Sequence, residues 1–485
     1  MKQILTVVAY VLLWAMPAMG EPMAFLFFQG DAQATKRYLA DDDAPAASNT
    51  TWGLTSAGKL CDLAVMCDAA PGAGTSWDFV LEVNGSAVTD VSCTISDTAT
   101  ACLDTSGAVC SGSLAAEDAV TVYAQPTGSP TTRRCRASLH YTDTDGSEHA
   151  GVVNMGNALV ITPVDGRFCG LYSPATFCNR ASASDTEWPM PNAGAFTSMT
   201  IRLNSASTAD QYTVRNESLA CDYNFQATFS GQSALRVTCA SGSGAQCATC
   251  DFANQDRVVI RYNNATPESH ARRVMLEWGG AGGLYGGQDT SQSAATDYFS
   301  PLGNLTGTTA PYRVGVATQL QRLTVHRAVA DTGASTHGVC HDATHAIPPT
   351  CSGANHPTQV ILSGQTTAQN MSDVATLAAG DYLQMSIGPR VTVDTAIQVY
   401  AEFVTLPGAT ATPTQTPMAT STATPSPTAT HTPIPPHPGC CDCPAPTPGG
   451  PPEAWGCHTP LPTTIPTMCA TACTYSASTV CLPNP

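Results

Sequence analysis

The sequence predicts an all-β fold of tandem β-sandwich or jelly-roll modules, followed by a disordered Pro/Thr stalk and a small disulfide-rich tail. One observation is an internal repeat, because Trp52 and Ala57-Gly58 recur as Trp188 and Ala193-Gly194 with the same displacement. Another is a series of short alternating strands separated by turn residues, with no capped run of helical periodicity. Repeats this long are whole domains, and ~100 to 135 residues can bury a core of their own.

A fainter third copy follows, because residues 317–325 echo residues 57–65. The glycine run 279–287 lacks the Lys-Ser/Thr of a phosphate-binding loop and reads as a flexible link between the second and third modules. The domain assignment is a signal peptide at 1–20, a first β-sandwich module with an N-terminal strand at 21–145, a second at 146–280, a Gly-rich link at 281–290, a third at 291–406, a Thr/Pro-rich stalk at 407–438 and a Cys-rich tail at 439–485.

The strands are expected in the following order. Residues 24–30 form an apolar first strand or an assembly strand. Residues 77–83 alternate between apolar and polar types, and Asn84-Gly85 then supplies the pair that favours positive φ in a two-residue hairpin. Strands are expected in the second module at 199–203, 225–229, 235–237 and 258–260, and in the third at 360–362 and 397–403.

The N-terminus indicates export. Lys2 precedes an apolar stretch from Ile4 to Trp14, and Ala18-Met19-Gly20 supplies the small residues of a cleavage site. No later stretch approaches the ~20 apolar residues of a membrane helix, so no transmembrane segment is expected. The formal net charge of −17 argues against nucleic acid as a partner. We therefore expect a secreted, extracellular or cell-surface protein.

The cysteines agree with an oxidising compartment, because the body holds an even number and the tail from Cys440 to Cys481 an odd number. The repeat-equivalent pairs Cys102–Cys110 and Cys239–Cys247 are predicted to be disulfides. Weaker predictions of the same kind are Cys93–Cys135, Cys169–Cys178 and Cys340–Cys351. The odd tail cysteine predicts a disulfide knot that tethers the protein to a partner or to a second copy. The alternatives are that the odd cysteine pairs with a cysteine of the body or stays an unreactive thiol.

Two loops could hold a metal. Asp143, Asp145 and Glu148 are spaced as a fragment of a calcium site, although the loop is shorter than an EF-hand and a solvated turn is the alternative. His337, Cys340 and His341 lie near His345, Cys351 and His356, but Cys351 offers Cys340 a disulfide partner in place of zinc. Cys247 and Cys250 have redox spacing without the βαβ context, which favours structural bridges. Apart from calcium, no cofactor is expected.

No nucleophile elbow or zinc-protease helix occurs in the chain, so no catalytic residues are predicted. Four tryptophans could form a sugar-stacking face or pack in the cores; they are Trp52, Trp77, Trp188 and Trp278. Core packing is favoured for Trp52 and Trp188, which are repeat equivalents.

A pattern-level resemblance adds to this interpretation. The segments 60–65, 70–74, 79–85, 93–96 and 117–120 resemble tandem jelly-roll repeats of secreted bacterial surface proteins, similar in pattern to C1q/TNF-like modules. The resemblance implies a structural or adhesive role on a Thr/Pro stalk, with cell-surface or matrix partners, glycans included, and disulfide-linked or trimeric self-association. The alternatives are a carbohydrate-binding module array and a secreted glycan- or peptide-directed hydrolase.

Overall fold

The described part of the chain is built from β-strands. The computed structural model describes residues 21–39, 51–104, 110–149, 151–169, 181–183, 186–190, 192–240, 247, 249–280, 283–288, 297–299, 311–330, 333, 335–342, 359–362, 364–387, 397–406, 440–442 and 474–476. In these residues no helix is long and apolar enough to cross a membrane. The chain divides into a body that ends at Thr410 and a second unit, Ala411–Pro485.

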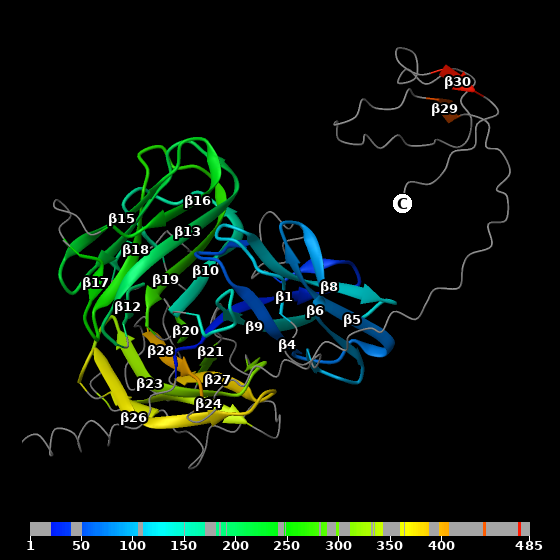
Figure 1. Ribbon diagram of the computed structural model, residues 1–485. Helices are drawn as coiled ribbons and strands as arrows, with labels where there is room; N and C mark the ends of the chain where they lie inside the picture. The colour runs from blue at the N-terminus through cyan, green and yellow to red at the C-terminus, as the bar shows by residue number, and fades with distance from the viewer. Residues whose placement is uncertain are drawn as a thin grey trace, which may run out of the picture. The chain divides into compact units, whose positions relative to one another are not determined.

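The body contains three successive groups of strands, coloured blue to cyan, cyan-green to green, and light green to orange in Figure 1. The first module comprises β1 (Ala24–Ala32), β2 (Arg37–Tyr38), β3 (Trp52–Gly53), β4 (Lys59–Cys67), β5 (Gly72–Val83), β6 (Ser86–Asp97), β7 (Ala101–Leu103), β8 (Ala119–Thr127) and β9 (Arg133–Thr142). The second comprises β10 (Gly151–Ile161), β11 (Phe168–Cys169), β12 (Trp188–Pro189), β13 (Gly194–Ser207), β14 (Gln211–Asn216), β15 (Cys221–Thr228), β16 (Gln232–Thr238), β17 (Asp251–Phe252), β18 (Arg257–Asn263) and β19 (His270–Gly279). The third comprises β20 (Gly283–Gln288), β21 (Asp297–Phe299), β22 (Tyr312–Arg313), β23 (Thr318–Arg327), β24 (Ser335–Asp342), β25 (Gln359–Leu362), β26 (Thr367–Leu377), β27 (Tyr382–Ile387) and β28 (Ile397–Val404).

Each module is a sandwich of two antiparallel sheets with the same strand order. In the first module the sheets run β1-β9-β4-β7 and β2-β8-β5-β6. The second has β10-β19-β13-β16 and β11-β18-β14-β15, and the third has β20-β28-β23-β26 and β21-β27-β24-β25. The first strand of each module therefore pairs with the last, and the second with the last but one, which is jelly-roll topology. The predicted all-β fold of tandem jelly-roll modules is confirmed.

Alternation along the strands builds the cores. Trp77, Phe79 and Leu81 of β5 point into the first core, as the sequence predicts. Asn84 and Gly85 have φ of 50° and 80° and join β5 to β6 in the expected hairpin.

The glycine-rich segment corrects one expectation, because a strand occupies it instead of a flexible link. Residues Gly283–Gln288 form β20 and pair in register with β28. A Cβ on Gly283 would lie 1.9 Å from the ring of Tyr400, so a larger residue there would collide with that side chain. This glycine allows the backbone to approach an aromatic ring.

A short connecting strand recurs in every module, after the second strand and before the next long strand. β3, β12 and β22 pair with β8, β18 and β27. Each begins with a buried aromatic residue: Trp52, Trp188 or Tyr312. The predicted equivalence of Trp52 and Trp188 is therefore confirmed, and Tyr312 is the third copy.

The connecting strands also dock one module on the next. β3 packs on β13 and β19 of the second module, and β12 packs on β23 and β28 of the third. β22 in turn packs on β4 and β9 of the first module. Contacts of one kind thus run from the first module to the second, from the second to the third, and from the third back to the first. Repeated head-to-tail contacts that close in this way form a ring.

The cores confirm this cyclic order. Phe25 and Phe27, on the outer face of β1, belong to the core cluster of the third module. Val152 and Met275 of the second module belong to the first cluster, and Tyr400 of the third belongs to the second cluster. β1 is therefore buried on both faces, which makes it both the first strand and an assembly strand.

Short polar contacts reinforce the docking. The hydroxyl of Thr200 donates to the Leu54 carbonyl over 3.0 Å, and the hydroxyl of Ser138 donates to the Arg313 carbonyl over 2.6 Å. Asn154 donates through Nδ2 to the carbonyl of Phe27 and accepts through Oδ1 from its amide.

In the second unit, β29 (Cys440–Asp442) pairs antiparallel with β30 (Thr474–Ser476). The stalk 407–438 and most of the tail lie outside the described residues. The predicted tail tether therefore stays a prediction.

Candidate functional site

The predicted calcium ligands do not converge. Asp145 Oδ1 accepts from the amide and hydroxyl of Ser147, at 2.9 and 2.6 Å. Glu148 Oε2 lies 2.7 Å from Nε2 of His140. Asp143 Oδ1 lies 3.6 Å from Nε2 of His149 instead. No group of three metal-binding side chains is assembled within the described residues. These carboxylates organise a turn and a histidine.

The histidine that holds Glu148 is itself buried at a contact between modules. Its Nδ1 lies 3.3 Å from Asp62, and its ring lies 5.4 Å from that of Phe25. Burial lowers the pKa of His140, but the hydrogen bonds and negative charges of Asp62 and Glu148 outweigh it and raise the pKa to about 9. The imidazole is therefore charged at neutral pH.

Three ionisable residues occupy the equivalent position on the last strand of each module: His140, Glu277 and Glu402. Glu277 accepts from the hydroxyl of Ser56 in the first module over 2.8 Å. Burial raises the pKa of Glu402 to about 7, although Arg322 at 3.2 Å opposes the shift. The sequence did not point to these three residues, because their burial depends on the neighbouring module.

The disulfide predictions have the right cysteines but the wrong partners. Cys102, Cys110, Cys239 and Cys247 are all bonded, yet neither Cys102–Cys110 nor Cys239–Cys247 forms. The bonds are Cys61–Cys110, Cys67–Cys135, Cys93–Cys102, Cys221–Cys247 and Cys239–Cys250. The reason is strand pairing: Cys67 and Cys135, for example, are directly opposite on β4 and β9. Such bonds indicate an oxidising compartment.

The remaining cysteine predictions divide in two. Cys93–Cys135 is wrong, because each residue bonds elsewhere. Cys247 and Cys250 belong to different disulfides, as the structural interpretation of that spacing expected. Cys169 and Cys340 are bonded, and their expected partners Cys178 and Cys351 lie outside the described residues.

The described residues of the predicted zinc site, His337 and Cys340, make other contacts. His337 is fully buried, and its Nε2 lies 2.8 Å from an Arg327 nitrogen. Cys340 is disulfide-bonded. His345 and His356 lie outside the described residues.

The four tryptophans do not form a sugar-stacking face. Trp52, Trp77, Trp188 and Trp278 are 2%, 0%, 0% and 0% exposed. Each ring is enclosed by its own core or by the next module, so stacking on a glycan through these residues is excluded.

A buried polar network lies at one end of the second module. Arg272 and Asp210 are fully buried and form a 3.0 Å ion pair. Tyr212 donates to Asp210 and accepts from Arg272, and Tyr262 donates to Asp210 over 2.6 Å. Because the charges are paired and hydrogen-bonded, this network is a structural element of the core.

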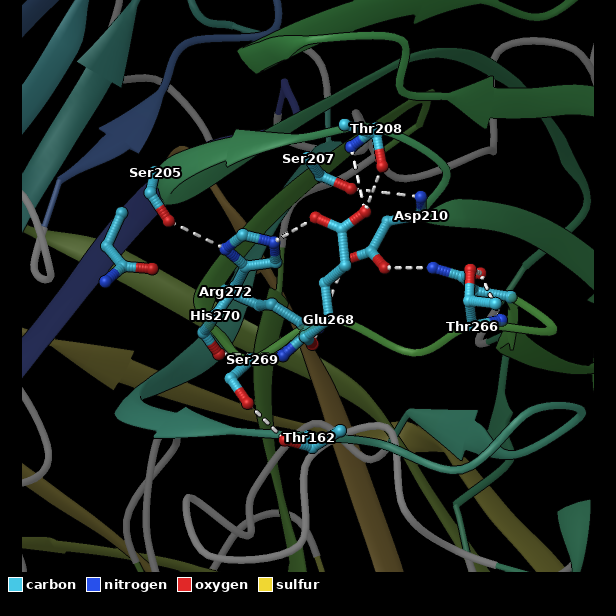
Figure 2. Close-up of polar contacts among 12 residues, drawn as sticks. Thr162, Ser205, Ser207, Thr208, Asp210, Thr266, Glu268, Ser269, His270 and Arg272 are labelled. Atoms are coloured by element: carbon cyan, nitrogen blue, oxygen red, sulfur yellow. Dashed lines mark hydrogen bonds and ion pairs between the residues drawn. The ribbon is translucent and has the colours of Figure 1, made fainter.

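The edge of this network carries a serine, a histidine and a carboxylate (Figure 2). Ser205 lies 3.0 Å from Nδ1 of His270, and Nε2 of His270 lies 3.1 Å from Glu268. The other Glu268 oxygen accepts from the amide and hydroxyl of Thr208, and these hydrogen bonds lower the pKa of Glu268 to about 2. The order resembles a nucleophilic triad, but its contacts link β13 and β19 to the turn at Thr208. The arrangement therefore holds the ends of these two strands and the turn together through hydrogen bonds.

The outer face of the β11-β18-β14-β15 sheet differs from these buried clusters, because it is polar and partly exposed. Its central row crosses four strands in register: Phe168 pairs with Arg261, Arg261 with Thr213, and Thr213 with Gln226. The chain neighbours of these four residues point into the core, so this row points outward.

The comparisons with known proteins do not identify a family. No protein-family model matches the chain, and no curated protein matches it. Among solved structures, the chain is similar to the major capsid protein P2 of bacteriophage PM2 at 8% identity. The match covers 53% of this chain and 98% of that one, with a TM-score of 0.16. At that score the likeness carries no argument about function, and the jelly-roll assignment rests on the strand order of this chain.

Proposed function

We propose that this protein is a secreted or cell-surface structural or adhesive protein, which displays three jelly-roll modules as one head on a stalk and performs no catalysis. The observation that carries the proposal is the closed set of contacts through β3, β12 and β22. A ring that closes within one chain gives the head the arrangement that a cyclic trimer obtains from three subunits.

Three further observations support the proposal. The export signal at 1–20 and the disulfides favour an extracellular location. The Thr/Pro composition of 407–438 is typical of an extended spacer, which would hold a head away from a surface. The resemblance to tandem jelly-roll repeats of secreted bacterial surface proteins implies the same kind of role.

The test compares the full chain with a chain that ends at Thr410. Intact producing cells are labelled with an antibody against the head, and the culture medium is assayed in parallel. We expect the full chain on the cell surface, adhesion of those cells to a matrix-coated plate, and the shortened chain in the medium. Retention of both chains inside the cell, or turnover of a polysaccharide or peptide by the purified protein, would overturn the proposal.

Self-association is tested separately by sedimentation of the chain ending at Thr410. Because the three modules already occupy one another's docking surfaces, we expect a monomer. A stable trimer of this shortened chain would show that the ring does not replace association between subunits.

A further inference from the structure

We propose that the outer face of the β11-β18-β14-β15 sheet binds an acidic polysaccharide, with the guanidinium of Arg261 taking a carboxylate or sulfate group of the sugar. The inference rests on the proposed adhesive function and names the partner of the head. It uses a face that does not involve the buried tryptophans.

Charge is the first argument. Arg215, on the same face, is paired with Glu217 at 2.8 Å and Asp222 at 3.0 Å. Arg257 is paired with Glu187 at 2.9 Å. Arg261 has no carboxylate within ion-pair distance among the described residues, and its buried Nε has no hydrogen-bond partner. A partly desolvated guanidinium without an anion is costly, and its planar fork matches a carboxylate or sulfate well.

The neighbours of Arg261 provide the second argument. Phe168, on the adjacent strand, is half-buried and offers an apolar ring, against which the C–H face of a pyranose can pack. Thr213 continues the row but is buried, with only 7% of its surface exposed. The exposed Gln226 beyond it offers an amide, which both donates and accepts hydrogen bonds. Strands lie ~4.8 Å apart, so the row of four side chains spans about 14 Å. That length suits a chain of sugars better than a single ion.

Other classes of partner fit less well. A protein partner would require an apolar centre, and this face is mostly polar. Nucleic acid would require several clustered cations, whereas the chain carries a formal charge of −17 and this face leaves a single arginine unpaired. The acidic polysaccharide uses one cation together with amide and aromatic contacts.

The experiment measures binding of the full mature chain to polygalacturonate, dextran sulfate and neutral dextran by biolayer interferometry. The variants are Arg261→Gln and Gln226→Ala. Arg133→Gln is the matched control, because Arg133 lies on β9 of the first module and, like Arg261, has a buried Nε without a hydrogen-bond partner. It removes the same charge from a different sheet. Circular dichroism and thermal unfolding confirm that each variant is folded.

We expect the full chain to bind at least one acidic polymer and not dextran, and the more strongly bound polymer distinguishes carboxylate from sulfate. Arg261→Gln should weaken binding about tenfold or more, as expected for loss of a charge-assisted hydrogen-bond pair. Gln226→Ala should weaken it less, and Arg133→Gln should leave it unchanged.

Equal loss in Arg261→Gln and Arg133→Gln would overturn the inference, because it would indicate non-specific attraction to charge. Failure of the full chain to bind either acidic polymer, or equal binding to dextran, would also overturn it. If Arg261→Gln does not fold, the test rests on Gln226→Ala, and an unchanged affinity of that variant for the acidic polymer would overturn the inference. Cells that display Arg261→Gln and still adhere normally would sink this inference while leaving the adhesive function intact.

Discussion

Nε2 of His326 lies 2.9 Å from Oε1 of Glu187, and this contact joins the third module to the second. Both side chains are almost fully buried. Glu187 directly precedes the connecting strand β12, so the carboxylate is placed where that strand meets β23. The same oxygen also accepts from Arg257. One buried carboxylate thus contacts both a histidine and an arginine at the contact between modules.

Replacing Glu187 with glutamine should destabilise this contact. Burial raises the pKa of Glu187, but hydrogen bonds and charges from His326 and Arg257 outweigh it and lower the pKa, so the charged form is favoured in the folded state. Losing that charge should cost about 2 kcal/mol, the usual contribution of a charge-assisted hydrogen bond. Urea unfolding measures this loss in the free energy of unfolding. Glu217→Gln, which alters a more exposed ion pair with Arg215, should cost less than about 1 kcal/mol. Equal unfolding midpoints for both variants would contradict the prediction.

His140 should make stability fall at alkaline pH. Its pKa is raised from 6.5 to about 9 in the folded state, so the folded protein holds this proton more tightly than the unfolded chain. The stabilisation is complete below pH 6.5 and is lost as the pH rises to about 9. The free energy of unfolding, measured between pH 6 and 9.5, should decrease. His140→Gln should flatten this slope, and Glu217→Gln should keep it. A His140→Gln variant with the slope of the unaltered protein would refute the assignment.

Glu402 should add a second slope at lower pH. Because burial raises its pKa from 4.5 to about 7, the folded state binds a proton that the unfolded state releases in this range. Stability should therefore fall as the pH rises from 4.5 to 7. Glu402→Gln should remove this component while leaving the alkaline slope of His140 in place. Loss of both slopes together would show that the two residues titrate as one unit.

Disulfide mapping should distinguish strand-pairing bonds from bonds between repeat equivalents. Non-reducing peptide mapping should recover Cys67–Cys135 and Cys93–Cys102. In the chain-entropy model the bonds, with sequence separations of 68 and 9, stabilise the fold by about 4 and 2.5 kcal/mol. Replacing both cysteines of the longer bond by serine should therefore lower stability more. Recovery of a Cys102–Cys110 peptide would invalidate the pairing.

Gly315 should be intolerant of a side chain. A Cβ there would lie 1.8 Å from the backbone oxygen of Asp62, at the contact between the third and first modules. Gly315→Ala should force the contact apart and increase hydrogen exchange in β1, whose outer face lies in the third core. Gly112→Ala is the control, because a Cβ on Gly112 meets nothing within 4 Å. Equal exchange in the two variants would show that this close approach does not hold the modules together.

The sequence by itself determined the local features. Alternation at Trp77–Val83 set which face of β5 points into the module's own core, and Asn84-Gly85 set the hairpin that follows, because both depend on residues adjacent in the chain. The repeat spacing also revealed that Trp52 and Trp188 are equivalent. Each of these properties repeats over a few residues or over one module, so a single chain exposes it.

Only the tertiary structure decided which distant residues meet. Cys67 bonds Cys135 because β4 and β9 are neighbours in register, a relationship that cysteine spacing does not encode. The outer face of β1 is apolar because a different module covers it. Arg261 stands out only when its strand neighbours and the pairing of Arg215 are seen together. Strand pairing over long distances in the sequence brings each residue to one partner among many of the same type, and the burial of a side chain depends on which partner that is. Local patterns therefore determine the strands, whereas packing determines the disulfides, the contacts between modules and the binding face.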